Sequence, residues 1–499
     1  MEQEIELKLL LPQGLDETAL LSAMSSFSAN IETAQFSLFN QYFDTADWIL
    51  SAHSIGLRVR SSEQGIEQTI KTAGKSVGGL HQRPEYNVAI NSLHPNLSLF
   101  SDKIWPQNLS VSYLQEHIEP IFSTDFKRKA FVLRLSDGSD VELVYDSGTI
   151  STGKDHTQIS EIELELKQGS VETLFQLAEK IAAIGPTQLC NISKAGRGFL
   201  LVKHALAPAK KELRFVELNS RDSVEQAFIK GLEYTLTYWQ QAEYRYMQTK
   251  KINDLVDVYI GLRVTSECIA TYRNILPCNA LTDLHNALAI RLRKWSWIEQ
   301  LKSLKILRSK RGAYSKRLSQ HDALVSYIRG LQDGTINLSR PDFLITHKDN
   351  TLLQLRLSSL LIEKPWRNNV ANDNINRNKF FSANLDVKWQ GVFAQITPEL
   401  DTSEGYLQQQ DALRSALFTD LLLGASFSSA RRDAFRLPWL DMLDGMDELQ
   451  TLKVLRTKLQ DSDVDDKADL IAWCEVKKKR LLTVIEQTKS VALSMETYW

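Results

Sequence analysis

Residues 4–8 read Glu-Ile-Glu-Leu-Lys, three charged residues that alternate with two apolar ones. The side chains of a β-strand point alternately to its two faces, so Glu4, Glu6 and Lys8 share one face. The ordinary interpretation is a strand whose charged face meets water and whose apolar face meets the core. Two like charges about 7 Å apart repel by about 2 kcal/mol at an effective dielectric constant near 20. If this face is enclosed, a cation must therefore lie against the carboxylates.

Length and composition limit the protein class. A chain of 499 residues exceeds what one core usually supports, so we expect at least two domains. The net charge of -2 argues against bulk attraction to nucleic acid or membrane. The acidic N-terminus is unlike a signal peptide, and no apolar run approaches the roughly 20 residues that span a bilayer. The four cysteines show no C-x-x-C spacing, so we expect free thiols and a cytoplasmic location.

The first part of the chain, residues 1–203, has mainly a period of two. Eight runs are typical of strands: 3–10, 35–43, 55–61, 66–72, 84–90, 125–135, 140–147 and 159–166. Helical patterns occupy 16–28 and 171–184, and the second ends at Gly185 and Pro186. A long connection with helical character is expected over 92–120.

The remainder of the chain has a different period. Residues 204–216 are typical of a linker, and residues 217–499 have a period near 3.6. A helical stripe begins this part: Val224, Phe228, Leu232, Leu236 and Trp239. We expect an all-helical domain over 217–499, so the fold class is α+β.

Charged residues recur on one face of nearly every predicted strand. The same alternation as in residues 4–8 groups Arg58 with Arg60, Glu67 with Lys71, Arg83 with Glu85, Arg128 with Arg134, Glu142 with Asp146, and Glu161 with Glu163 and Glu165. Two architectures fit. An open sheet would turn this face to water, whereas a closed antiparallel barrel of about eight strands would turn it inward.

A charged barrel interior would have a particular ligand class. Its basic residues would suit a compact polyanion, because arginine forks match phosphate oxygens and lysine adds a point charge: Lys8, Arg58, Arg60, Lys71, Arg83 and Arg128. Its acidic residues would suit hard divalent cations: Glu4, Glu6, Asp146, Glu161 and Glu163. A polyphosphate bound with a metal ion explains both signs, and the cation offsets the repulsion between Glu4 and Glu6.

The same residues carry a resemblance to a known family, the CYTH proteins or triphosphate tunnel metalloenzymes. Its signature is E-x-E-x-K near the N-terminus. Further matching segments follow in order over about 200 residues: YFDT (42–45), GLRVR (56–60), TIKTAG (69–74), RPEYN (83–87), FKRK (126–129), VYDSG (144–148), EIELEL (161–166) and SKAGRG (193–198). The resemblance implies a closed antiparallel tunnel of eight strands with flanking helices.

The resemblance also implies roles. Phosphates would be held by Lys8, Arg58, Arg60, Lys71, Arg128 and Lys194, and alternation adds Arg83. Glu85 would orient these basic residues. Mg²⁺ or Mn²⁺ would be bound, directly or through water, by Glu4, Glu6, Asp146, Glu161 and Glu163.

The helical part resembles a degenerate CHAD domain, which often follows CYTH in one chain. The V-H-x-x-R pattern of that family is replaced by VDVYI, with Asp257 and Ile260 at the histidine and arginine places. Residues 290–318 contain ten Lys and Arg against one acid, Glu299. This stretch is either a solvated surface or a contact for long-chain polyphosphate or nucleic acid, and a nucleic-acid partner is not favoured by the net charge.

These observations predict a metal-dependent hydrolase of inorganic triphosphate. Glu4 or Glu161 would orient the attacking water, and Lys8 would stabilise charge on the phosphates. Two alternatives stay open. One is a hydrolase or cyclase of an organic triphosphate, such as thiamine triphosphate or ATP. The other is a non-catalytic polyphosphate-binding protein.

Overall fold

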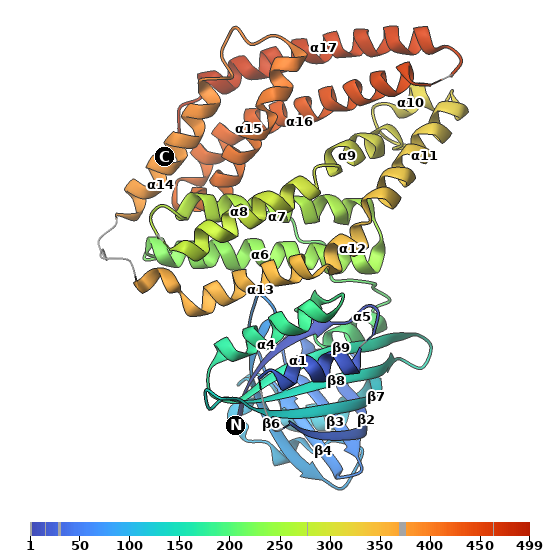
Figure 1. Cartoon of the computed structure of the whole chain (residues 1–499), viewed down its shortest axis with the longest axis vertical. Coiled ribbons are helices and arrows are strands. Elements are labelled where there is room, and N and C mark those ends of the chain that lie inside the picture. The colour runs from blue at the N-terminus through green and yellow to red at the C-terminus, as the bar shows by residue number, and fades with distance from the viewer. Residues whose placement is uncertain (1, 15, 28–30, 277, 369–375, 463) are drawn as a thin grey trace. The chain divides into compact units, whose positions relative to one another are not determined.

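The computed structural model describes nearly the whole chain, namely residues 2–14, 16–27, 31–276, 278–368, 376–462 and 464–499 (Figure 1). The chain divides into two compact units. The tunnel unit contains Met1–Lys210, Glu243–Lys250 and Asp342–Glu363, and the helical unit contains Lys211–Ala242, Lys251–Pro341 and Lys364–Trp499. Over the described residues, no helix has the length and apolar character that crossing a membrane would require.

The tunnel unit is built on a closed ring of antiparallel strands, eight among the described residues. In ring order these are β1 (Glu2–Leu10), β9 (His156–Gln168), β8 (Asp140–Ser151), β7 (Ile118–Arg134), β2 (Ile31–Thr45), β3 (Gly56–Ser62), β4 (Gly65–Lys71) and β6 (Leu80–Ile90). The pairing of β1 with β6 closes the ring. Two short strands extend it, β5 (Lys75–Val77) beside β6 and β10 (Gln188–Leu189) beside β1. The predicted fold class, including the closed barrel, is confirmed.

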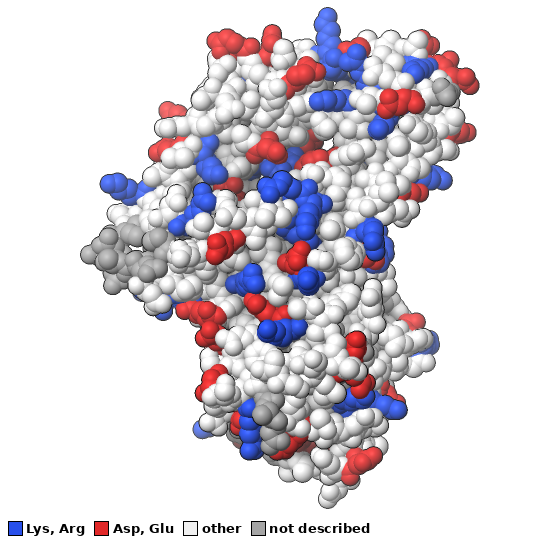
Figure 2. Space-filling model, viewed as in Figure 1, with Lys and Arg blue, Asp and Glu red and all other residues white. Residues whose placement is uncertain are grey.

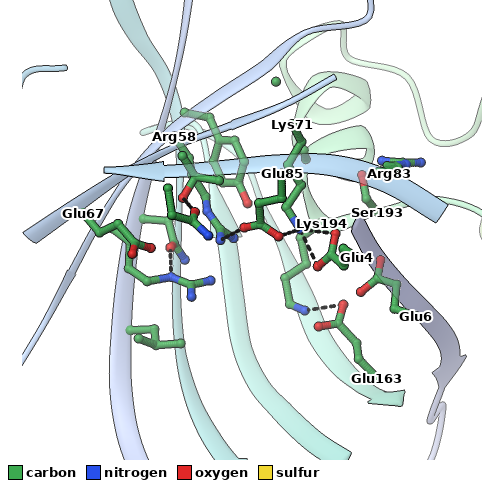
Figure 3. A pocket seen from close by; sticks show the side chains of 18 of the residues that line it. Glu4, Glu6, Arg58, Glu67, Lys71, Arg83, Glu85, Glu163, Ser193 and Lys194 are labelled. Atoms are coloured by element: carbon green, nitrogen blue, oxygen red, sulfur yellow. Dashed lines mark hydrogen bonds and ion pairs between the residues drawn. The ribbon is translucent and has the colours of Figure 1, made fainter. Parts of the chain in front are cut away.

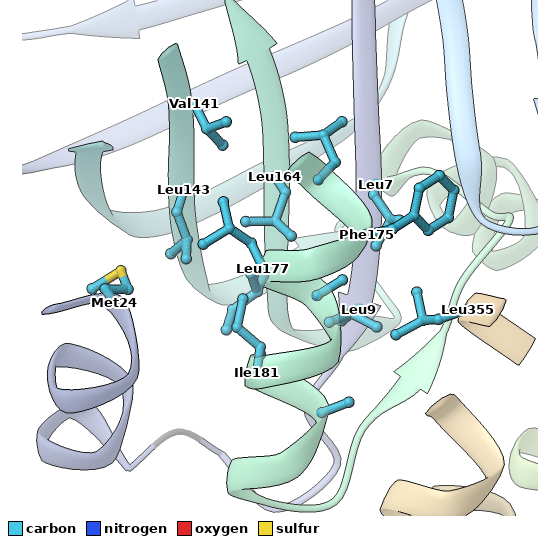
Figure 4. Packing of buried hydrophobic residues seen from close by; sticks show 14 of the residues in the cluster. Leu7, Leu9, Met24, Val141, Leu143, Leu164, Phe175, Leu177, Ile181 and Leu355 are labelled. Atoms are coloured by element: carbon cyan, nitrogen blue, oxygen red, sulfur yellow. The ribbon is translucent and has the colours of Figure 1, made fainter. Parts of the chain in front are cut away.

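The outer face of β1, β8 and β9 is apolar and lies under helices. Leu7 and Leu9 of β1 are fully buried in a cluster with residues of α4 (Val171–Ile184) (Figure 4). Ser170 caps α4, since its side chain accepts a hydrogen bond from the backbone N–H of Glu172. The helix α1 (Glu17–Ser25) adds Leu20 and Met24 to this cluster. Alternation therefore places the apolar residues outside the ring and the charged residues inside it.

A helix from much later in the chain completes this cover. Leu355 of α13 (Lys348–Glu363) is fully buried in the same cluster. The hydroxyl of Thr351 donates to the carbonyl of Thr187 at 2.8 Å, and that of Ser358 donates to the carbonyl of Gly78 at 2.7 Å. Residues 348–363 thus belong structurally to the tunnel unit, and the short helix α12 (Pro341–Thr346) leads into them.

The connection expected over 92–120 is partly helical. It contains η1 (Leu97–Leu99), η2 (Asp102–Ile104) and α3 (Val111–His117). Together with α2 (Ile49–Ala52) these segments bury the outer face of β3 and β4 in a second apolar cluster.

The helix α5 (Lys194–Val202) packs against the ring at β7, β8 and β9. Its approach is close at Gly198, where an added Cβ would lie 2.1 Å from the ring of Phe122. Ser193 caps this helix by accepting from the backbone N–H of Gly196. The cap and the close packing fix the first residue of the helix, Lys194, against the barrel.

The helical unit confirms the period of 3.6. Its helices, with the shared helix α6 first, are α6 (Val224–Thr249), α7 (Ile252–Tyr272), α8 (Asn279–Lys294), α9 (Ile298–Leu307), α10 (Ser315–Leu318), α11 (Asp322–Ser339), η3 (Pro365–Asn368), α14 (Arg377–Phe393), α15 (Ser403–Leu423), η4 (Gly424–Ser426), α16 (Ser429–Gln460) and α17 (Lys467–Ser494). The stripe residues of α6, from Val224 to Trp239, are all buried.

Candidate active site in the strand tunnel

The ring of strands encloses a cavity of about 1290 Å³ whose lining carries both signs of charge (Figure 3). Eleven of the thirteen residues expected at the site line it: Glu4, Glu6, Lys8, Arg58, Arg60, Lys71, Arg83, Glu85, Arg128, Glu163 and Lys194. The other two, Asp146 and Glu161, are fully buried beneath the lining. The inward face of the strands is therefore not a solvated outer surface.

One side of the cavity is organised by Glu4 and Glu85. The ammonium of Lys71 lies 2.6 Å from both oxygens of Glu4 and 3.2 Å from Glu85. Glu85 also accepts from the guanidinium of Arg58 at 3.3 Å. Burial raises the pKa of Glu85, but Lys71 and Arg58 outweigh it and lower the pKa below its ordinary value. Glu85 is therefore ionised and lies between two cations, where it can orient both.

Lys8 is the cation of β1, and only 2% of its surface is exposed. Its ammonium lies 2.6 Å from Glu163 and 3.8 Å from both Glu6 and Glu161. Burial lowers the pKa of Lys8, but these carboxylates outweigh burial and raise the pKa well above its ordinary value. Lys8 therefore stays charged at any physiological pH.

Lys194 lies among three carboxylates. Its ammonium is 2.6 Å from Asp146, 2.5 Å from Glu161 and 3.0 Å from Glu163. Burial raises the pKa of Asp146 and Glu163, yet the attraction of Lys194 outweighs it and lowers both pKa values. Nothing in the sequence places a residue of α5 inside the barrel, so the position of Lys194 was expected from the family resemblance alone.

Two further arginines complete this buried network. Arg128 makes a two-pronged contact with Asp146, with both donor–acceptor distances at 2.7 Å, and reaches Glu163 at 3.2 Å. Arg197, which the sequence analysis missed, donates to Glu161 and is 8% exposed. Its place one turn after Lys194 on α5 was the available signal, since residues three apart share a helix face.

Arg60 differs from the other cations of the cavity. Its Nε donates to the side-chain oxygen of Asn40 at 2.8 Å, and Asn40 in turn donates to Thr124 at 2.8 Å. Within the described part of the chain, no carboxylate forms an ion pair with Arg60. Burial, followed by repulsion from Arg58 and Arg128, lowers the pKa of Arg60 to about 9. An anion placed here would relieve an excess of positive charge.

Three residues near one another extend the site beyond the expected set. Lys167 bridges Glu165 at 2.7 Å and Glu142 at 3.3 Å, and all three line the cavity. Alternation indicates both glutamates, and it also places Lys167, which directly follows the EIELEL segment, on the same face. Arg134, which alternation also indicates, is exposed.

The carboxylates provide a donor set for a divalent cation. Asp146, Glu161 and Glu163 each offer an oxygen within 4.8 Å of the others. Carboxylate oxygens are the ligands that Mg²⁺ and Mn²⁺ prefer. These three carboxylates also contact Lys194, so a metal ion among them would have to share their oxygens with the Lys194 ammonium or displace it.

A second group of carboxylates contains one, Glu6, that is only loosely paired with a cation. Glu4 and Glu6 line the cavity, and the pairing of β1 with β9 sets Glu165 directly opposite Glu6. Among the described residues, the ion pair of Glu6 is with Lys8 at 3.8 Å, longer than a hydrogen bond. The residues therefore fit a hard divalent cation, and Glu6 is the carboxylate most open to it.

The basic stretch 290–318 lies in the helical unit and is only partly exposed. Lys302 pairs with Asp447 at 3.2 Å, and Arg308 and Lys305 donate to side-chain amides. Five of its ten cations are exposed: Arg293, Lys294, Lys310, Arg311 and Lys316. On the face of the molecule in Figure 2, basic and acidic side chains are interspersed, in keeping with the net charge of -2.

Comparison with known proteins finds similarity over the tunnel part of the chain. Residues 2–199 match the model described as CYTH domain. An inorganic triphosphatase of Haemophilus influenzae is 38% identical over 210 residues, which cover 40% of this chain and 55% of the relative's length. The chain thus spans about half of that relative.

Two solved structures are similar. A putative adenylyl cyclase from Hippeastrum, described as having a dominant triphosphatase activity, has a TM-score of 0.30 and 23% identity, covering 41% of this chain and 98% of its own. The CHAD domain from Ricinus communis has a TM-score of 0.45 and 12% identity, covering 58% of this chain and 99% of its own. Both TM-scores lie below 0.5, so the fold of this chain rests on its own strand pairings and helices.

Proposed function

We propose that the tunnel hydrolyses inorganic triphosphate to diphosphate and phosphate with the help of Mg²⁺ or Mn²⁺, a proposal that the match of residues 2–199 to the CYTH domain model supports. One observation supports this most strongly. Arg60 lies next to Arg58 and Arg128 inside an enclosed cavity and has a lowered pKa without a carboxylate partner in the described part of the chain. Such a cluster favours a ligand that carries several negative charges close together.

The chain's own residues would position the substrate. The guanidinium of Arg60 would take the first phosphate contact, and Arg58, Lys71 and Arg128 would exchange part of their carboxylate pairing for phosphate oxygens. Phosphoryl transfer needs mostly positioning and charge stabilisation, which fixed cations supply. The oxygen of a water molecule attacks the terminal phosphorus, and the bond from that phosphorus to the bridging oxygen breaks. Diphosphate leaves with the bond's electron pair.

The carboxylates divide into two roles. Glu4 lines the cavity, and we propose that it orients the attacking water and accepts its proton. Glu161 is fully buried against Lys194 and Arg197, so its proposed contribution is to hold those cations in place. Lys8, charged and enclosed, would stabilise negative charge on the transferred or leaving phosphate.

A divalent cation would supply charge neutralisation and Lewis acidity at the phosphate oxygens. Glu4, Glu6 and Glu163 line the cavity and would hold it, with Glu165 opposite Glu6 as a further donor. The buried pair Asp146 and Glu161 would act from beneath, through the cations that they already contact.

Phosphate release from tripolyphosphate, ATP and thiamine triphosphate, each with Mg²⁺, Mn²⁺ or EDTA, tests the proposal. We expect tripolyphosphate to be the preferred substrate and EDTA to abolish turnover. Preference for ATP, or a cyclic nucleotide product, would favour the organic triphosphate alternative. Binding of polyphosphate without any turnover would favour a non-catalytic module.

Several expectations for the rest of the chain remain predictions. They are the boundaries 1–203, 204–216 and 217–499, a CHAD-like identity for the helical part, polyphosphate contact through 290–318, and a cytoplasmic location. Calorimetry of the full chain with long-chain polyphosphate, before and after exchange of Lys310 and Arg311 for glutamine, tests the contact. Unchanged heat of binding would leave the basic stretch as an ordinary surface.

A further inference from the structure

The inner face of β6 carries one more charged or polar residue than the motifs indicate. Alternation groups His81 with Arg83 and Glu85, and the pairing of β1 with β6 sets His81 opposite Glu6. His81 is 1% exposed, so it lies behind the cavity lining. The charged groups that shift the pKa of its ring most are Lys8, Glu6 and Arg83.

Both ring nitrogens of His81 have partners. Nε2 lies 3.2 Å from the backbone carbonyl oxygen of Cys190, and Nδ1 lies 3.4 Å from a terminal nitrogen of Arg83. A carbonyl only accepts and a guanidinium only donates, so the partners assign the proton to Nε2 and leave Nδ1 as an acceptor. Burial and the charge of Lys8 lower the pKa of His81 to about 4, which agrees with a neutral ring.

These two contacts connect neighbouring segments of the tunnel. Arg83 lines the cavity, and its terminal nitrogen contacts the ring of His81. Cys190 is fully buried, donates its N–H to the carbonyl of Lys8 at 3.1 Å, and lies four residues before Lys194. The imidazole therefore holds the start of the segment that carries Lys194 into the barrel, and it also meets the guanidinium of Arg83.

We infer that His81 is a positioning residue, which directs Arg83 toward the bound anion through Nδ1 and anchors the segment before α5 through Nε2. It touches neither substrate nor metal and acts through Arg83 and Cys190. The 3.4 Å contact is longer than an ordinary hydrogen bond, and such contacts often tighten when substrate binds. This inference rests on the proposed function, since the anion that Arg83 meets is the triphosphate.

Two conservative variants separate the two contacts. The amide oxygen of His81→Asn can replace Nδ1, whereas the amide nitrogen of His81→Gln can replace Nε2. For tripolyphosphate hydrolysis we expect His81→Gln to raise KM about tenfold with kcat little changed, the effect of one lost hydrogen bond to a charged group. His81→Asn, which keeps the contact with Arg83 and loses only the one with Cys190, should raise KM clearly less than His81→Gln does. Gln82→Leu, whose side chain points to the other face of the strand, is the matched control.

A double-mutant cycle shows whether His81 acts through Arg83. We expect His81→Gln to leave KM unchanged when Arg83 is already glutamine, because the contact is then absent. Additive effects of the two substitutions, or equal KM values for His81→Asn and His81→Gln, would overturn the inference. Both outcomes are distinct from loss of the proposed function, which would show as a wild-type protein that does not turn over tripolyphosphate.

A readout without substrate completes the test. In the full chain with ¹⁵N-labelled histidine, the His81 signal is assigned by its loss in His81→Gln. We expect the neutral ring with its proton on Nε2 at pH 7. A charged ring, or a proton on Nδ1, would overturn the inference even if the triphosphatase proposal holds.

Discussion

Replacing Lys194 by methionine removes the cation that three buried carboxylates share. Methionine keeps the length of the side chain but leaves Asp146, Glu161 and Glu163 with one ammonium fewer. Breaking a buried ion pair by removing one partner usually destabilises a protein by about 3–5 kcal/mol. At about 2–4 °C per kcal/mol for a domain of this size, the tunnel unit should melt about 6–20 °C lower.

The same variant should respond more strongly to metal. With Lys194 absent, the three carboxylates meet a divalent cation without a competing ammonium. Mg²⁺ at a hundred times its Kd would restore about 2.7 kcal/mol, roughly 5–11 °C. Differential scanning fluorimetry of wild type and variant, with Mg²⁺ and with EDTA, measures both effects.

Lys180→Met provides the matched control. Lys180 is exposed on α4, and surface substitutions of this kind change stability by about 0.5 kcal/mol or less. If Lys194→Met melted within 2 °C of the wild type, or if Mg²⁺ raised both melting temperatures equally, the assignment of Lys194 to the carboxylate cluster would be wrong.

Three further predictions follow from the same structure. Arg60→Gln should weaken tripolyphosphate binding, measured by calorimetry, by about 10- to 100-fold, which is the value of a hydrogen bond to a charged group. Its melting temperature should be nearly unchanged, because Arg60 has no ion-pair partner in the described chain. Normal affinity would refute the role of Arg60. The pKa values of Asp146 and Glu163 are lowered, so the stability that these carboxylates contribute is complete above the ordinary carboxyl pKa near 4 and is lost as pH falls through the lowered values. The melting temperature should therefore fall with acidification below about pH 4. A flat pH profile would contradict this. Leu355→Ala should destabilise the tunnel unit by about 2–5 kcal/mol in chemical denaturation, and Arg356→Ala on the same helix by less than about 1 kcal/mol; equal effects would mean that α13 does not complete the barrel's cover.

Alternation along the strands predicted most of the tunnel. It placed Arg58, Arg60 and Lys71 on one face, and the structure brings all three to the cavity. Alternation could not decide between an open sheet and a closed ring, because the pairing of β1 with β6 joins segments whose contact no local pattern encodes. The ordered set of family motifs made that decision, and the ring confirms it.

Strand alternation gave no signal for other parts of the tunnel unit. Lys194 and Arg197 enter the barrel from a helix whose direction depends on the packing of Gly198 against Phe122. Leu355 joins the tunnel unit from a part of the chain whose period predicted only a helix. Tertiary packing decides these placements, and strand alternation or helix period reports only which face a residue occupies within its own element.

Turnover of tripolyphosphate by Lys8→Met tests whether the fixed charges of the tunnel hydrolyse triphosphate. Phosphate release is measured with saturating Mg²⁺ at a temperature where melting curves show both proteins folded. Loss of a fixed charge that stabilises the reacting phosphates should lower kcat by about 10²- to 10³-fold relative to the wild type. A folded Lys8→Met protein that releases phosphate at nearly the wild-type rate would show that the tunnel does not perform this chemistry in the proposed way.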